Sequence, residues 1–253
     1  MFPSFSIGPI VIPTGPFLVI LGVWLALLLV EKAAVLLKQD GIILYSLAVV
    51  GLAVGVLVAR ISFVALYWPA YRAAPLSIIW PLTSGYLPWA GAAAGAAALF
   101  FYGRYRRLPV RPTLDGLTPG LLALLLTVSL ADFAAGPGYG RETTMPWAVT
   151  AYGISRHPVQ LYEIGFALAG LLVWWQLARR THFAGQPFLG GVGVYAGGRL
   201  FVEAFRANSW LVADGYRGVQ IVAWAVLLAA IFLWGQWRTQ QSLEAAATRS
   251  DPE

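Results

Sequence analysis

Long apolar runs separated by short polar or proline-rich segments dominate the pattern of this chain. Seven such runs have roughly the 17–25 residues that a transmembrane helix needs, at 16–37, 42–66, 86–103, 116–135, 159–178, 186–206 and 217–237. Only helices and closed barrels satisfy every backbone hydrogen bond inside lipid. The pattern therefore predicts an all-α fold: a polytopic integral membrane helix bundle with about seven transmembrane helices.

Two polar stretches interrupt the apolar pattern. Residues 156–163, Arg-His-Pro-Val-Gln-Leu-Tyr-Glu, open the fifth run, and Gln160 and Glu163 share one helical face. In the sixth run, Tyr195, Arg199, Glu203 and Arg206 follow at spacings of four, four and three, which also places them on one face. A charge at the centre of a membrane helix costs at least ~2.5 kcal/mol.

We therefore expect Arg199 and Glu203 to face the bundle interior and to meet the segment 156–163. Two interpretations remain open at this point. The charges form an ion pair that joins two helices, or both helices together build one polar site.

A lone cation lies deep in the second run. Arg60 follows the small-residue stripe Gly51, Gly55 and Ala59, which predicts close helix packing. The arginine either pairs with an acid inside the bundle or receives an anionic ligand.

Composition supports a membrane protein and excludes several kinds of site. Of 253 residues, 59% are hydrophobic and 11% are charged, whereas soluble domains have about 25% charged residues. We expect one transmembrane domain, 1–253, with a polar cytoplasmic tail at 238–253. The chain has no cysteine and two histidines, so we expect no metal site, and no cofactor is implied.

The net charge of +6 follows the loops rather than a nucleic-acid-binding face. Ten basic residues flank one side of the runs and five flank the other, and the loop bias sets membrane orientation. The first group is Lys32, Lys38, Arg104, Arg106, Arg107, Arg111, Arg179, Arg180, Arg238 and Arg249, and the second is Arg72, Arg141, Arg156, Arg206 and Arg217. The N-terminus should be extracytoplasmic and the C-terminus cytoplasmic, with both polar stretches toward the extracytoplasmic half.

The segment 156–163 resembles the RHPxQLYE motif of the bacterial prolipoprotein diacylglyceryl transferases. The set Tyr195, Arg199, Glu203 and Arg206 resembles that family's next motif, and Gln220 follows at a similar position. Residues 145–149 (MPWAV) are similar to its PWAV segment, and residues 55–60 to its second-span glycine–arginine pattern. The resemblance is most specific over 145–206.

This resemblance implies an enzyme of the bacterial plasma (inner) membrane, with several spans. Its partners would be phosphatidylglycerol and the signal peptide of a prolipoprotein, whose lipobox cysteine thiol receives the diacylglyceryl group. A thioether forms and glycerol phosphate leaves.

Such a reaction needs cations for the phosphate and a proton acceptor for the thiol. The phosphate-binding candidates are Arg60, Arg141, Arg156, Arg199 and Arg206. The possible proton acceptors are His157, Glu163 and Glu203, and a carboxylate bonded to Arg199 is a poor base, so His157 is the better candidate. The expected site comprises His157, Arg199 and Glu203 as catalytic residues, with Arg60, Arg141, Arg156, Gln160, Tyr162, Glu163, Tyr195 and Arg206 binding substrate.

The chain differs from the family at two motifs. The run 85–91 has no histidine where the family has one. At 129–141, the family's arginine appears as Ser129 and its two asparagines as Asp132 and Ala135. These differences keep a second hypothesis open, a non-catalytic relative that binds phospholipid or prolipoprotein. A generic transporter fits less well, because the polar residues gather toward one side instead of lining a path across the membrane.

Overall fold

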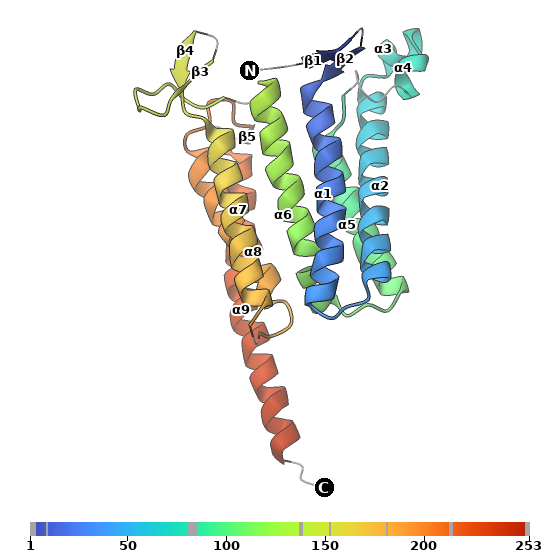
Figure 1. Cartoon of the computed structure of the whole chain (residues 1–253), viewed down its shortest axis with the longest axis vertical. Helices are drawn as coiled ribbons and strands as arrows, with labels where there is room; N and C mark the ends of the chain where they lie inside the picture. The colour runs from blue at the N-terminus through green and yellow to red at the C-terminus, as the bar shows by residue number, and fades with distance from the viewer. Residues whose placement is uncertain are drawn as a thin grey trace.

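The computed structural model describes residues 4–8, 10–79, 85–136, 139–151, 153–180, 182–212 and 215–250. Helices running alternately up and down make up most of this part, as Figure 1 shows. Seven of the helices in these ranges have 18 residues or more: α1 (Thr14–Leu36), α2 (Gly41–Leu66), α5 (Pro88–Tyr105), α6 (Val110–Ala135), α7 (Val159–Ala178), α8 (Gln186–Glu203) and α9 (Gly218–Ser250). Each one corresponds to one predicted apolar run.

Five of these helices, α1, α2, α6, α7 and α9, are long and apolar enough to cross a membrane. The predicted helical membrane bundle is thereby confirmed in this coarser form. Helices α5 and α8 have 18 residues each. Helix α5 is rich in alanine and glycine, and α8 contains several glycines together with Arg199 and Glu203.

Three helix ends differ from the ends of the predicted runs. Helix α6 begins at Val110 instead of 116, because the carboxylate of Asp115 finds backbone partners and does not have to lie outside the helix. Helix α8 ends at Glu203, so Arg206 lies in the turn that follows it. Helix α9 continues through the expected polar tail to Ser250, because that tail is rich in good helix formers such as Ala, Glu and Gln.

The connectors on one side of the bundle contain structure that the all-α prediction omitted. Two short helices, α3 (Trp68–Ala73) and α4 (Leu76–Ile79), follow α2. Three antiparallel hairpins pair β1 (Ser4–Ile7) with β2 (Ile10–Pro13), β3 (Val149–Ala151) with β4 (Ile154–Arg156), and β5 (Leu211–Val212) with β6 (Tyr216–Arg217). These short segments satisfy their backbone groups by pairing locally.

Small residues allow close approach where α2 packs on α5. A Cβ atom on Gly91 would lie 2.7 Å from the carbonyl oxygen of Gly55, a distance that no real side chain tolerates. The prediction that the Gly51–Ala59 stripe packs closely is confirmed. Helix α1 packs mainly on α6 and α7 on α8, while α6 contacts α7 and α9 contacts α8.

Asp115 joins three helices through its side chain and its backbone carbonyl at the end of the bundle where α6 begins. Asp115 is 2% exposed. It accepts hydrogen bonds from the backbone N–H groups of Gly185 (2.6 Å) and Phe188 (2.9 Å), which would otherwise lack partners at the start of α8. The indole of Trp174 in α7 donates to the carbonyl of Asp115 (2.8 Å). Asp115 thus caps α8 from α6.

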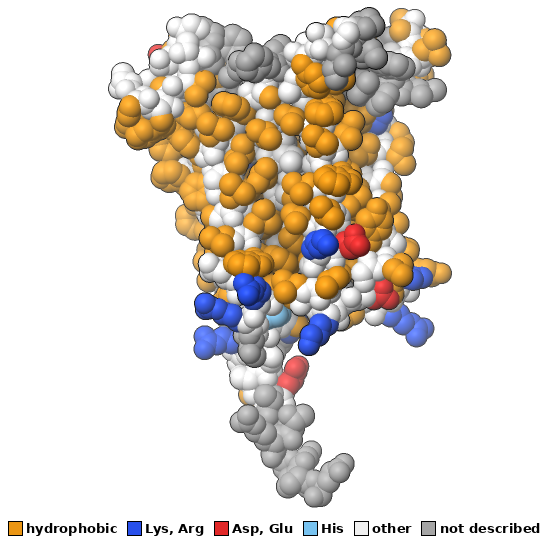
Figure 2. Space-filling model, viewed as in Figure 1, with side chains coloured by type: hydrophobic (Ala, Val, Ile, Leu, Met, Phe, Trp, Pro, Cys, Tyr) orange, Lys and Arg blue, Asp and Glu red, His pale blue; other side chains and the backbone are white. Residues whose placement is uncertain are grey.

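Figure 2 shows apolar side chains covering the middle of the molecule. Lysine and arginine side chains gather near the end from which α9 projects, and this end also carries the loops after α1, α5 and α7.

Candidate functional site

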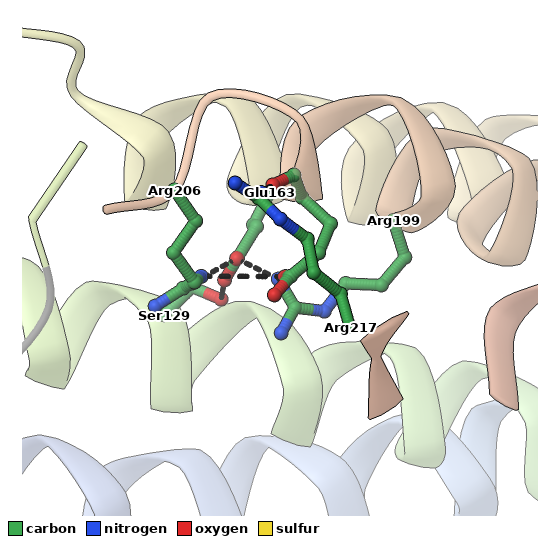
Figure 3. A network of polar contacts seen from close by, with 6 residues as sticks. Ser129, Glu163, Arg199, Arg206 and Arg217 are labelled. Carbon is green, nitrogen blue, oxygen red and sulfur yellow. Dashed lines mark hydrogen bonds and ion pairs between the residues drawn. The ribbon is translucent and has the colours of Figure 1, made fainter. Parts of the chain in front are cut away.

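Glu163 is the centre of a buried polar cluster at the end of the bundle opposite Asp115. Its side chain lies one turn inside α7 and is 6% exposed. Oε2 accepts a hydrogen bond from the hydroxyl of Ser129 in α6 (2.8 Å). Oε1 accepts from Nη1 of Arg199 in α8 and from Nη2 of Arg206. Figure 3 shows these side chains converging from α6, α7, α8 and the turn beyond α8.

A second carboxylate lies on the other side of the arginines. Glu203 is fully buried, and its Oε2 is 3.6 Å from Nη1 of Arg199 and 3.5 Å from Nε of Arg206. Neither carboxylate oxygen has a hydrogen-bond partner among the described residues. The backbone carbonyl of Glu203 accepts a hydrogen bond from Nη1 of Arg217 in β6. The two arginines therefore compensate the negative charge of the Glu203 carboxylate, whose oxygens can still accept hydrogen bonds.

The predicted meeting of the two polar stretches is confirmed. Arg199 and Glu203 face inward and contact the segment 156–163 at Glu163, as the cost of charge in lipid requires. Arg206 reaches the same carboxylate from the turn beyond α8 rather than from the helix face. Tyr195 lies half-buried in α8, close enough to interact electrostatically with Arg199 and Glu163.

His157 belongs to a separate polar group next to the cluster. Its Nδ1 lies 3.1 Å from the hydroxyl oxygen of Tyr162, and the indole of Trp147 donates to the same oxygen (2.8 Å). The imidazole ring lies 4.9 Å from the ring of Phe205, the residue before Arg206. His157 therefore packs against Phe205, the residue next to Arg206 in the chain.

Arg156 and Arg141 lie outside the cluster. Arg156 is 3.9 Å from the carboxylate of Glu142, and it donates to the carbonyl of Gly140 (3.3 Å). The backbone of Arg141 links two segments next to the cluster: its N–H donates to the carbonyl of Phe205 (2.7 Å), and its carbonyl accepts from the N–H of His157 (3.0 Å). Its side chain is exposed. Gly140 packs tightly against the backbone of His157, because a Cβ atom on Gly140 would be 2.3 Å from the carbonyl oxygen of His157.

Arg60 also lies apart from the cluster, and of its two predicted alternatives the pairing with an acid is not found among the described residues; binding of an anionic ligand stays a prediction. Its guanidinium donates to the carbonyls of Ile78 (3.0 Å) and Gly85 (2.9 Å) and to the hydroxyl of Tyr71 (3.3 Å). Backbone carbonyls of the connector between α2 and α5 thus satisfy the cation in place of a carboxylate. Arg60 orders this connector.

Sequence reasoning missed two members of the cluster, Ser129 and Arg217. A serine within the leucine- and alanine-rich α6 was a weak signal, because a hydroxyl in an apolar helix often bonds its own backbone. Gln160, which was predicted, is 2% exposed, and it has a bonding partner. Within the described ranges, no three His, Asp or Glu side chains are grouped as a metal site requires.

The cluster contains more charged groups than a single ion pair. Two guanidinium groups converge on one buried carboxylate, and a third approaches from β6. Guanidinium groups bind carboxylates and phosphates in forked geometry. The cluster lies between helices whose outer faces are apolar.

A family model described as "Prolipoprotein diacylglyceryl transferase" matches residues 3–236. A phosphatidylglycerol–prolipoprotein diacylglyceryl transferase of Bordetella parapertussis is 32% identical over 203 residues, covering 75% of this chain and 69% of the relative. Proteins of the same name from Enterococcus faecalis and Lactobacillus gasseri are 27% and 28% identical, over 72% of this chain in both cases and 71% and 70% of the relatives.

Proposed function

The chain belongs to the prolipoprotein diacylglyceryl transferase family, and from this premise we propose that it transfers the diacylglyceryl group of phosphatidylglycerol to the lipobox cysteine of a prolipoprotein. The observation that carries the proposal is the convergence of Arg199 and Arg206 on Glu163 inside an apolar bundle. The thiol sulfur bonds to the terminal diacylglyceryl carbon, the bond from that carbon to the phosphate oxygen breaks, and glycerol phosphate leaves with the electron pair.

The arginines are suited to holding the lipid phosphate through this step. The phosphate gains negative charge as it leaves, and preorganised donors in a site without water stabilise that charge strongly. Among the described residues, every contact of Arg199 uses Nη1, which leaves Nη2 and Nε to donate to a phosphate. Glu163 and Ser129 hold the guanidinium groups in place before the lipid arrives.

Glu203 is suited to recognising the glycerol end of the lipid. Its carboxylate oxygens are buried and lack hydrogen-bond donors among the described residues. A buried acceptor without a donor costs about 1–3 kcal/mol or more. In this proposal the headgroup hydroxyls supply the missing donors, which favours phosphatidylglycerol over headgroups without hydroxyls.

His157 is the proposed acceptor of the thiol proton. Tyr162 already receives one hydrogen bond, from Trp147. If Nδ1 of His157 carries its proton and donates to the same phenol oxygen, Nε2 is left to accept the proton of the thiol. The proposal therefore requires the tautomer of His157 that carries its proton on Nδ1.

The placement in the membrane follows from the loop charges. We propose seven spans in the bacterial plasma membrane, including α5 and α8, whose 18 residues extend about 27 Å as helices. The N-terminus is then extracytoplasmic and the C-terminus cytoplasmic, with the Glu163 cluster toward the extracytoplasmic side. Activity of a cytoplasm-dependent reporter at 136–140, together with its inactivity at the C-terminus, would reject this orientation.

Complementation tests the enzyme. The full chain is expressed in a bacterium depleted of its own diacylglyceryl transferase, and lipid-modified prolipoprotein is detected by mass spectrometry. We expect the modification to be restored, and Arg199→Lys not to restore it. Expressed, membrane-inserted chain that binds phosphatidylglycerol but leaves the precursor unmodified would favour a non-catalytic lipid-binding relative.

A further inference from the structure

Charge within the cluster is closely balanced. Arg199 and Arg206 form ion pairs with Glu163 and Glu203, two cations against two carboxylates. The four groups thus cancel one another and leave no net positive charge for a phosphate.

Arg217 changes this balance. It extends from β6 into the same cluster, as Figure 3 shows. Its Nη1 donates to the backbone carbonyl of Glu203, and it forms no ion pair with a carboxylate among the described residues. A guanidinium has five N–H donors, and only one is used in this contact. Among the described residues, Arg217 is therefore a cation of the cluster whose charge and remaining donors are not committed to an acid.

We propose that Arg217 is a phosphate-binding residue, whose guanidinium supplies the positive charge that allows the cluster to accept a phosphate-bearing lipid. The inference rests on the proposed function, because the phosphate is that of the lipid donor. The hairpin β5–β6 and the first turn of α9 position the residue, since the backbone N–H of Gly218 bonds to the carbonyl of Trp210 (2.9 Å). The hairpin is thus part of the binding site as well as a connector.

A purely structural role for Arg217 makes a different prediction. The contact with the carbonyl of Glu203 resembles a cap at the C-terminal end of α8, where a basic side chain satisfies an unpaired carbonyl. Glutamine and lysine can both donate to that carbonyl, but only lysine carries a charge. A capping role predicts equal behaviour for both substitutions, whereas a role in phosphate binding separates them.

The experiment compares Arg217→Gln and Arg217→Lys with the wild-type chain in detergent. Short-chain phosphatidylglycerol is titrated by calorimetry, transfer to a lipobox peptide is measured in parallel, and thermal melting monitors folding. We expect Arg217→Gln to bind about tenfold or more weakly, the loss of one charge-assisted hydrogen bond, and Arg217→Lys to stay within a few-fold of wild type. Arg72→Gln, an exposed arginine of α3, removes the same charge elsewhere and should change neither binding nor transfer.

Relocating the charge provides a second test. Ser129 contacts Glu163 from α6 and cannot cap α8, so Ser129→Arg in the Arg217→Gln background restores charge without restoring the cap. We expect binding to recover in part. Equal binding by the Gln and Lys variants, or a folded double variant with no recovery, would overturn the role of Arg217. Wild-type chain that neither binds phosphatidylglycerol nor transfers its lipid would overturn the proposed function first and this inference with it.

Discussion

Glu163→Gln should lower the free energy of unfolding more than the same substitution at an exposed glutamate does. Glutamine keeps the size of the side chain and an oxygen for Ser129, but it removes the charge that Arg199 and Arg206 share. A hydrogen bond to a charged group is worth about 1.5–3 kcal/mol and a neutral one about 0.5–1.5. Weakening two such bonds by roughly 1–1.5 kcal/mol each gives a loss of about 2–3 kcal/mol in the free energy of unfolding.

The assay is thermal melting of the purified chain in detergent. At about 2–4 °C per kcal/mol for a chain of this size, Glu163→Gln should lower Tm by about 4–12 °C. Glu142→Gln is the matched control, because Glu142 pairs with Arg156 at 3.9 Å but is 68% exposed. Exposed pairs contribute about 0–1 kcal/mol, so this control should shift Tm by about 4 °C at most. Melting of Glu163→Gln within a degree of wild type would refute the view that this carboxylate holds three helices together.

Three further substitutions separate binding, chemistry and folding. Arg199→Lys keeps the charge but loses the forked guanidinium, so transfer measured with a lipobox peptide should fall about tenfold or more while the chain still melts cooperatively. His157→Gln can still bond to Tyr162 but cannot accept a proton, so transfer should fall by about 10²–10⁴-fold, with phosphatidylglycerol binding unchanged in a titration; wild-type rates would exclude His157 as the base. Asp115→Asn removes one of the two acceptors at the start of α8, so Tm should drop by an amount that corresponds to about 1–3 kcal/mol, with the rate of transfer per folded molecule unaffected.

The helices and the centre of the cluster could be predicted because both depend on the cost of polar groups in lipid. Apolar runs of sufficient length have to be helical, and the runs lie where the long helices are. Arg199 and Glu203 are expensive in a membrane unless they meet partners, so their inward orientation and their contact with the segment 156–163 followed from spacing alone. For Arg60 the same reasoning offered an acid or a ligand and left out the backbone carbonyls that accept its hydrogen bonds.

The rest depended on connectors, whose geometry apolar patterning does not determine. Arg217 was counted only as a loop charge, since nothing in its spacing relates β6 to the end of α8. Ser129 marked a difference from the family motif, yet its hydroxyl bonds to the central carboxylate of the cluster. With a neutral hydroxyl on α6 and a guanidinium on β6 that pairs with no carboxylate among the described residues, the cluster has three cations and two carboxylates. The helix motifs alone give two of each, so in our proposal the positive charge that a phosphate needs comes from a residue outside every predicted motif.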